Sequence, residues 1–185
     1  MSTSDPVERR QYLSFSLAGS AFGVGILQVR EILQYEAITP VPSVPPSVRG
    51  VINLRGSVVP VIDIAVKFGL PPTPIANRTC ILVVETSLDG LSTVMGVMAD
   101  AVSEVLDLAP SDIEPPPPFG TRVRADFLLG LGKVGRGFVL LLDLDRVISA
   151  DEHEILAGIA APDAPLDAPP AASQDETSPP ATVGP

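Results

Sequence analysis

The chain has 185 residues, of which 45% are hydrophobic and 18% charged, and its mean hydropathy is +0.35. This composition excludes a chain that is disordered throughout, and the length suits one domain or two small lobes that share a core. The net charge of −10 and the scattering of the basic residues, among which Arg9-Arg10 is the only adjacent pair, argue against a phosphate-binding surface. We therefore expect no nucleic-acid partner.

The two ends of the chain differ from its middle. Residues 1–10 lack the apolar stretch of a secretory signal, and we expect them to be a flexible start. Residues 161–185 contain seven prolines, four acidic residues and no base, which predicts a disordered tail to which we assign no role. No apolar run reaches the roughly 18 residues of a membrane helix, so we expect a cytoplasmic protein with no direct membrane insertion.

Strand signals dominate from residue 11 onward. The apolar and polar residues alternate over 12–17, which predicts a half-buried strand, and 18–20 then form a turn into a short return strand at 21–25. From 26 to 34 the apolar residues recur at helical spacing, so we predict a short helix there. Four prolines within 39–46 indicate an extended, ordered connection, because proline has no amide donor for a central strand.

Two strongly apolar runs follow, Val48–Leu54 and Val58–Ile64, and they flank Arg55-Gly56-Ser57. Glycine tolerates positive φ, so this pattern predicts a tight hairpin. A helical turn over 65–69 should come next. We place a joint between lobes at the proline-rich residues 71–74.

The second half of the chain repeats this pattern of short apolar strands and turns, with a second joint between lobes near the prolines at 115–118. Roughly eight to ten short strands with few helices indicate an all-β protein built as two small barrel-like lobes packed together. The elements expected in this half are strands over 79–85, 93–98, 101–108, 127–134 and 137–142, a short helix capped by Asp143, and a terminal helix over 151–159.

No constellation of polar side chains indicates catalysis. Cys80 is the only cysteine, which rules out an intramolecular disulfide, and its apolar neighbours predict a buried thiol. The single histidine, His153, lies between two glutamates, and we expect it to be solvated on a helix. Gly130–Gly135 has G-x-G-x-x-G spacing, but a strand follows it, so we interpret it as a hairpin turn. We expect no enzyme activity, no metal and no cofactor.

Arg55 is harder to explain by core packing. It lies at the turn between two apolar strands, where its guanidinium must reach solvent or pair with an acid. Two interpretations remain open. One is an internal ion pair, and the other is a contact with a partner protein, because arginine is favoured at interface hot spots.

Several stretches together carry a family resemblance. They are Tyr12-Leu13-Ser14-Phe15-Ser16-Leu17 with Phe22-Gly23-Val24, Val29-Arg30-Glu31-Ile32-Leu33, Val41-Pro42 with Val48-Arg49-Gly50-Val51-Ile52-Asn53-Leu54-Arg55-Gly56, Gly96 to Leu106, and Phe127-Leu128-Leu129-Gly130-Leu131-Gly132. In this order, over residues 11–150, they resemble the CheW family of chemotaxis coupling proteins.

The resemblance implies an all-β, CheW-like fold over residues 11–160, with two interleaved, SH3-like, five-stranded barrel lobes and a few short helices. It implies a non-enzymatic adaptor that couples the cytoplasmic tips of methyl-accepting chemoreceptors to the histidine kinase CheA in membrane-associated arrays. An alternative is the same kind of scaffold in a non-motility chemosensory pathway. Neither alternative requires a cofactor.

The resemblance also implies two binding surfaces. The receptor tip should lie in a groove between the lobes, and the CheW-like domain of the kinase should pair barrel to barrel with the first lobe. The residues implied for the receptor are Val29, Glu31, Gly50, Asn53, Arg55, Val97 and Val102. Those implied for the kinase are Val24, Ile26 and Leu27.

Overall fold

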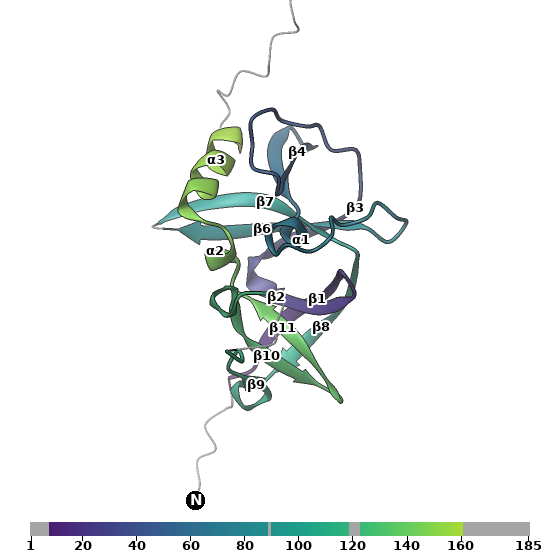
Figure 1. The fold of residues 1–185 in the computed structure, drawn as a ribbon, viewed down its shortest axis with the longest axis vertical. Coiled ribbons are helices and arrows are strands. Elements are labelled where there is room, and N and C mark those ends of the chain that lie inside the picture. The colour runs from purple at the N-terminus through teal and green to yellow at the C-terminus, as the bar shows by residue number, and fades with distance from the viewer. Residues whose placement is uncertain (1–7, 89, 119–122, 161–185) are drawn as a thin grey trace, which may run out of the picture.

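The structure is a computed structural model, and it describes residues 8–88, 90–118 and 123–160. Strands make up about half of the described residues, and the helices are few and short (Figure 1). The strands are β1 (Arg10–Leu17), β2 (Ser20–Gly25), β3 (Val29–Gln34), β4 (Val48–Leu54), β5 (Ser57–Ile62), β6 (Cys80–Leu88), β7 (Leu91–Ala99), β8 (Ala101–Leu108), β9 (Ile113–Glu114), β10 (Leu128–Val134) and β11 (Gly137–Leu142). The helices are η1 (Ile26–Gln28), α1 (Ile64–Lys67), η2 (Pro110–Asp112), η3 (Ala125–Phe127), α2 (Leu144–Val147) and α3 (Ala150–Ala160).

These strands form two sheets that repeat one arrangement. One sheet has the order β8-β1-β2-β11-β10-β9, and the other has the order β3-β6-β7-β5-β4. In each sheet a central hairpin pairs in parallel with one strand of an outer hairpin, with Leu141 opposite Gly23 in the first sheet and Val61 opposite Gly96 in the second. The described residues therefore confirm an all-β fold of two lobes.

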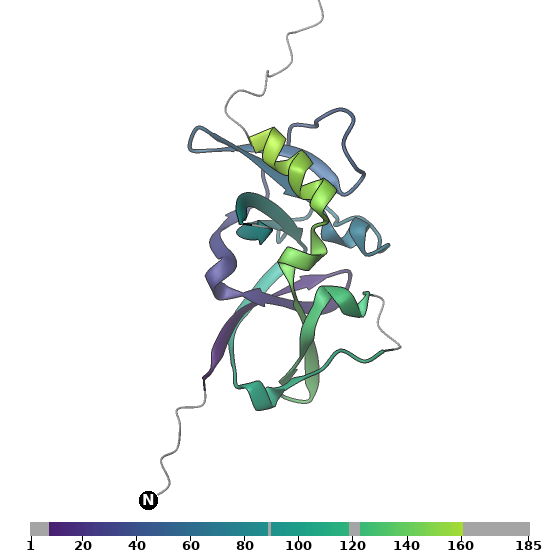
Figure 2. The same cartoon turned by 90° about the vertical axis from the view of Figure 1, so that its left-hand side faces the viewer.

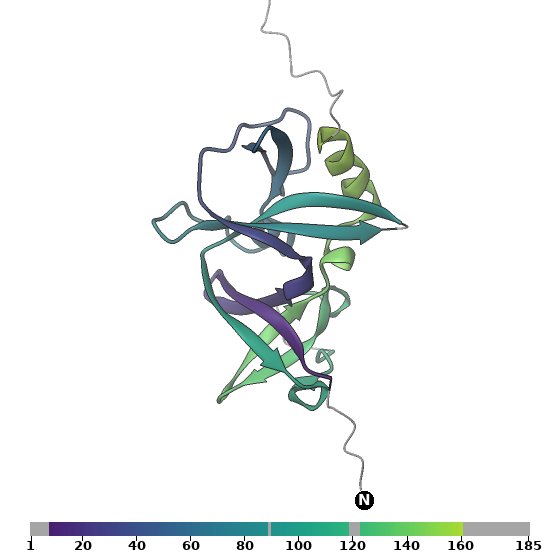
Figure 3. The ribbon, with the colours of Figure 1, turned by 180° about the vertical axis from the view of Figure 1, so that it is seen from behind.

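The lobes are interleaved along the chain. The six-stranded sheet takes β1 and β2 from the N-terminal half and β8 to β11 from the C-terminal half. Figure 3 shows β1 and β8 running side by side in this lobe, where they pair antiparallel. The chain crosses between the sheets from β2 through η1 to β3, and again at Asp100 between β7 and β8.

The proline-rich segments do not lie at these crossings. Residues 71–74 connect α1 to β6, and β6 belongs to the same sheet as β4 and β5. Residues 115–118 follow β9, and the chain then returns to β10 of that same sheet. The prolines therefore lie in loops within a lobe, whereas the crossings are the short connections that follow β2 and β7.

The helix predicted over 26–34 is wrong. Only Ile26–Gln28 are helical, as a 3-10 turn, and Val29–Gln34 form the edge strand β3. Exposure alternates along β3, and Ile32 points outward with 46% of its surface exposed. This outward isoleucine gave the sequence its helical spacing. The segment is a strand because it pairs antiparallel with β6.

One core joins the two lobes. Four phenylalanine rings form a chain through it, with centroid separations of 6.1 Å from Phe15 to Phe22, 6.0 Å from Phe22 to Phe68 and 5.8 Å from Phe68 to Phe127. Phe15 and Phe22 belong to one sheet, whereas Phe68 follows α1 of the other. The expectation of a shared core is confirmed.

The other local predictions within the described residues are mostly confirmed. Cys80 is buried, and that burial raises the pKa of its thiol. Gly135, with φ +58°, lies in the turn between β10 and β11, so the glycine-rich stretch is a hairpin. Asp143 caps α2 by accepting a hydrogen bond from the Arg146 amide. Of the residues predicted to be flexible, 1–7 and 161–185 lie outside the described ones, whereas Arg10 is already the first residue of β1 and pairs with Leu108.

His153 contradicts its prediction, because it is 3% exposed rather than solvated. The terminal helix α3 packs against β5 and β7 (Figure 2), and His153 and Leu156 lie on its buried face. The Nδ1 atom of His153 is 3.4 Å from Oγ1 of Thr93 on β7. The flanking glutamates misled the sequence argument, since neighbours in a helix point in different directions.

Candidate protein-interaction surfaces

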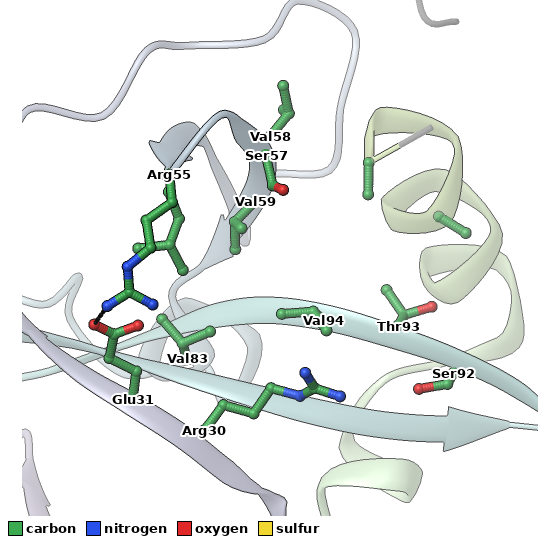
Figure 4. A pocket seen from close by; sticks show the side chains of 13 residues that line it. Arg30, Glu31, Arg55, Ser57, Val58, Val59, Val83, Ser92, Thr93 and Val94 are labelled. Carbon is green, nitrogen blue, oxygen red and sulfur yellow. Dashed lines mark hydrogen bonds and ion pairs between the residues drawn. The ribbon is translucent and has the colours of Figure 1, made fainter. Parts of the chain in front are cut away.

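A groove lies on the five-stranded sheet between the β4–β5 hairpin and α3 (Figure 4). We call it the Arg55 groove. Its lining residues are Arg30, Glu31, Leu54, Arg55, Ser57, Val58, Val59, Val83, Ser92, Thr93, Val94, Ala157 and Ala160. Valines therefore line it together with charged and hydroxyl-bearing side chains, a mixture suited to orienting a partly apolar partner.

Local backbone geometry places Arg55 at the tip of its hairpin. Arg55 and Gly56 have φ values of +52° and +86°, as a two-residue type I′ turn requires. The side chain of Asn53 supports this turn, because its Oδ1 accepts a hydrogen bond of 2.9 Å from the Gly56 amide. The turn directs the Arg55 side chain toward β3 (Figure 4).

Arg55 makes the internal ion pair that the sequence left as one alternative. Its Nη2 lies 2.7 Å from Oε1 of Glu31 on β3. The Arg55 side chain is nevertheless 77% exposed, compared with 27% for Glu31. Because guanidinium carries five donors, the pair leaves Arg55 able to meet a partner's carboxylate. The contact with a partner stays a prediction.

A second charged pair on the same surface was missed by sequence reasoning. Arg30 forms an ion pair with Glu85 of β6, and its Nε donates to the same carboxylate at 2.8 Å. The Ser92 hydroxyl also donates to Glu85. The hydrogen bond from Ser92 and those from Arg30 lower the pKa of the Glu85 carboxyl. These contacts join β3, β6 and β7, so no local sequence pattern could have revealed them.

The remaining residues implied for receptor binding lie outside the lining of the Arg55 groove. Val97 is 1% exposed and belongs to the core, while Val29 and Val102 are half-buried against it. Gly50 touches the preceding loop, since a Cβ there would lie 2.7 Å from the Thr39 carbonyl carbon. The Arg55 groove is thus formed by one sheet and α3, and not by the junction of the two lobes.

The residues implied for kinase binding also divide into two groups. Leu27 is 97% exposed, and Ile26 beside it is half-buried, whereas Val24 is 1% exposed and supports the core. We call the region around Leu27 the Leu27 surface. It is a shallow depression lined by Glu8, Arg9, Arg10, Gln11, Tyr12, Gly25, Ile26, Leu27, Asp107 and Leu129.

Leu129 is an exposed apolar residue of this surface that sequence reasoning did not assign. It is 50% exposed and occupies the bulge of β10, where Leu128 pairs with Leu142 and Gly130 with Leu141. The bulge turns Leu129 away from the core. Two exposed leucines distant in sequence, Leu27 and Leu129, therefore line one surface.

Within the described ranges, none of the helices is both long enough and apolar enough to span a membrane.

Comparison with known proteins agrees with this architecture. Residues 11–152 match the family model of the CheW-like domain. The chain is 32% identical to a chemotaxis protein CheW of Klebsiella aerogenes over 82% of this chain and 89% of that protein. It is 33% identical to a chemotaxis protein CheW of Rhizobium meliloti, over 78% of this chain and 91% of that protein.

A solved structure gives the same result. The crystal structure of the scaffolding protein TtCheW from Thermoanaerobacter tengcongensis superposes with a TM-score of 0.69 at 30% identity, covering 82% of this chain and 95% of that one. The superposition covers both lobes at a sequence identity that also supports common ancestry. The chain belongs to the CheW family of chemotaxis scaffold proteins.

Proposed function

We propose that this protein is a non-enzymatic adaptor that couples the cytoplasmic tips of methyl-accepting chemoreceptors to the histidine kinase CheA. In this proposal it is cytoplasmic and is recruited to membrane-associated receptor arrays. The observation that carries the proposal is a pair of candidate binding surfaces that share no lining residue, the Arg55 groove and the Leu27 surface. An adaptor needs two such surfaces, because both partners must be held at once.

The Arg55 groove suits the tip of a helical receptor. A helix can place apolar side chains against Val58, Val83 and Val94, while charged residues at the rim fix its direction. Glu31 positions Arg55 through their ion pair, and the exposed part of the guanidinium can meet an acidic residue of the receptor. We expect Arg55 to set the orientation and specificity of receptor binding.

The Leu27 surface suits the CheW-like domain of the kinase. Leu27 and Leu129 present apolar area to solvent, and burial of such area drives the association of proteins. Leu27 lies in η1, which leads directly into β3 and hence to Glu31 of the Arg55 groove. The two proposed interfaces are thus connected by one short, continuous segment of backbone.

Replacement of Arg55 tests the receptor interface. We expect Arg55→Ala to leave the fold intact, because the pair with Glu31 is largely exposed and such pairs contribute about 0–1 kcal/mol to stability. Receptor binding should weaken by about 1–3 kcal/mol, or roughly 5- to 150-fold, as for an interface hot spot. Binding to the kinase should not change. Calorimetric titration with a soluble receptor-tip fragment and with the kinase domain measures both.

Arg124→Ala is the matched control. Arg124 is 74% exposed and pairs with Asp126 at 2.8 Å, but it belongs to the other lobe. We expect the control to bind both partners normally. Unchanged receptor affinity in Arg55→Ala would refute the assignment of the groove. A pull-down from lysate that recovers neither a chemoreceptor nor a histidine kinase would refute the adaptor function.

A further inference from the structure

The wall of the Arg55 groove contains the last residues of α3, Ala157 and Ala160. The family match ends at residue 152, so most of α3 and all of 161–185 lie beyond it. We propose that the segment 161–185 of this same chain binds in the Arg55 groove and competes there with the receptor. The competition rests on the proposed function, whereas the intramolecular contact does not.

The position of Ala160 gives the segment access to the groove. Asp163 and Asp167 follow Ala160 by three and seven residues. An extended chain spans at most about 3.5 Å per residue, so these carboxylates reach up to roughly 10 and 24 Å from Ala160. The strand β7, against which α3 packs, is separated from β3 by two strand spacings, a distance of about 10 Å. The reach of Asp167 is therefore more than twice this distance, whereas Asp163 reaches an arginine of the far rim only where the arginine side chain extends back toward α3.

The chemistry of the segment complements that of the groove. Residues 161–185 carry four acidic side chains and no basic one. The groove offers Arg30 and Arg55, whose side chains are 55% and 77% exposed despite their ion pairs. Leu166 lies between Asp163 and Asp167 and can contact the valines of the groove while the acids reach the rim. Proline has a fixed φ, so the seven prolines reduce the entropy lost on binding.

Because the segment is covalently attached to the domain, even a weak contact would occupy a large share of the grooves. Attachment of two binding elements through a short connection provides an effective concentration on the order of 1 mM. An intrinsic dissociation constant of about 1 mM would fill half of the grooves, and one of about 0.1 mM would fill roughly nine in ten. Receptor binding would then weaken by about 2- to 10-fold relative to an empty groove. The segment would act as a built-in competitor that sets the threshold for receptor binding.

Paramagnetic broadening of amide signals tests the contact in the full chain without any partner. A nitroxide is attached at Ala168→Cys, and the burial of Cys80 directs the label to the new thiol. We expect the amide signals of Ser57 and Thr93 to lose at least half of their intensity. The amide of Phe138, at the β10–β11 hairpin of the other lobe, should keep its intensity. Equal intensity at all three amides would overturn the proposal.

Two charge variants of the labelled chain test the mechanism. Asp163→Asn with Asp167→Asn should abolish the broadening and strengthen receptor-tip binding by about 2- to 10-fold. Asp175→Asn with Glu176→Gln removes the same charge farther along the chain and should leave most of the broadening. If both pairs of substitutions had equal effects, the assignment of Asp163 and Asp167 would be wrong.

A mixture of spin-labelled chains and isotope-labelled, unmodified chains separates contacts within one chain from contacts between copies. Broadening in the mixture would overturn the intramolecular proposal in favour of a second copy's segment. Broadening within one chain without any receptor binding would sustain this contact and refute the adaptor function. Receptor binding without broadening would sustain the adaptor function and overturn this contact.

Discussion

Gly50→Ala tests the close approach of the Gly50 backbone to the loop at Thr39. Gly50 has φ +140° at the bulge of β4, and an added Cβ would lie 2.7 Å from the Thr39 carbonyl carbon and 2.8 Å from Cγ2 of Ile38. The loop must then move away and break two hydrogen bonds, Thr39 N to Val51 O at 2.9 Å and Val51 N to Thr39 O at 2.8 Å. At about 1 kcal/mol for each bond and about 1–2 kcal/mol for strain at positive φ, we expect a loss of about 3–4 kcal/mol.

Urea unfolding at constant m-value measures this loss, and faster hydrogen exchange at the Val51 amide locates it. Gly135→Ala is the matched control, because Gly135 has φ +58° and nothing within 4 Å of an added Cβ. The control should lose only about 1 kcal/mol, the strain of the left-handed conformation. If the two variants differed by less than about 1 kcal/mol, the close approach to Thr39 would not constrain Gly50, and the reasoning would fail.

Two further predictions concern the Leu27 surface and the attachment of α3. Leu27→Asp should leave stability unchanged and weaken kinase-domain binding at least about 10-fold in a calorimetric titration. The control is Leu91→Asp, because Leu91 is 65% exposed and lies outside both surfaces, and this variant should bind the kinase domain normally. Burial by itself would raise the pKa of Glu152, but hydrogen bonds from Lys67 and Ser149 and the charge of Lys67 more than offset it and lower that pKa. A lowered folded-state pKa means that the stabilisation is present above the unfolded value, near 4.5, and is lost as pH falls through the folded value. Glu152→Gln should therefore lose about 3 kcal/mol at pH 7, where the half-buried Lys67 is left without its charge partner, and urea unfolding should show this gap closing below about pH 4.5. A gap that stayed constant with pH would contradict the assignment.

The strands and turns could be predicted from sequence because their signals are local. Alternation over 12–17 and the glycine-containing turn after Leu54 each specify a conformation within a few residues, and the strand and the turn are both confirmed. The strand over 12–17 is not half-buried as predicted, because Ser14 is buried together with the apolar residues on both sides of it. Burial of Cys80 follows in the same way from its apolar neighbours. The family resemblance supplied the pairing of these pieces into two lobes, which hydrophobic periodicity alone did not provide.

The candidate site was only partly predictable. The resemblance selected Arg55 and Glu31, and the structure brings them to 2.7 Å although Glu31 lies on the edge strand β3 and Arg55 in the turn of the β4–β5 hairpin. The pair of Arg30 with Glu85 and the wall formed by α3 had no sequence signal, because each depends on which strands become neighbours. Val97 was selected as a surface residue and is buried, since a family motif can mark packing as well as contact.

By itself, the sequence determined an all-β chain, its hairpins, its apolar core residues and its family. Only the tertiary structure decided that β3 is an edge strand, that the crossings follow β2 and β7, and that His153 lies on the buried face of α3. The physical reason is the range of the interactions. Turn geometry and alternation act between near neighbours, whereas strand pairing and helix packing depend on residues tens of positions apart that meet only when both lobes have formed.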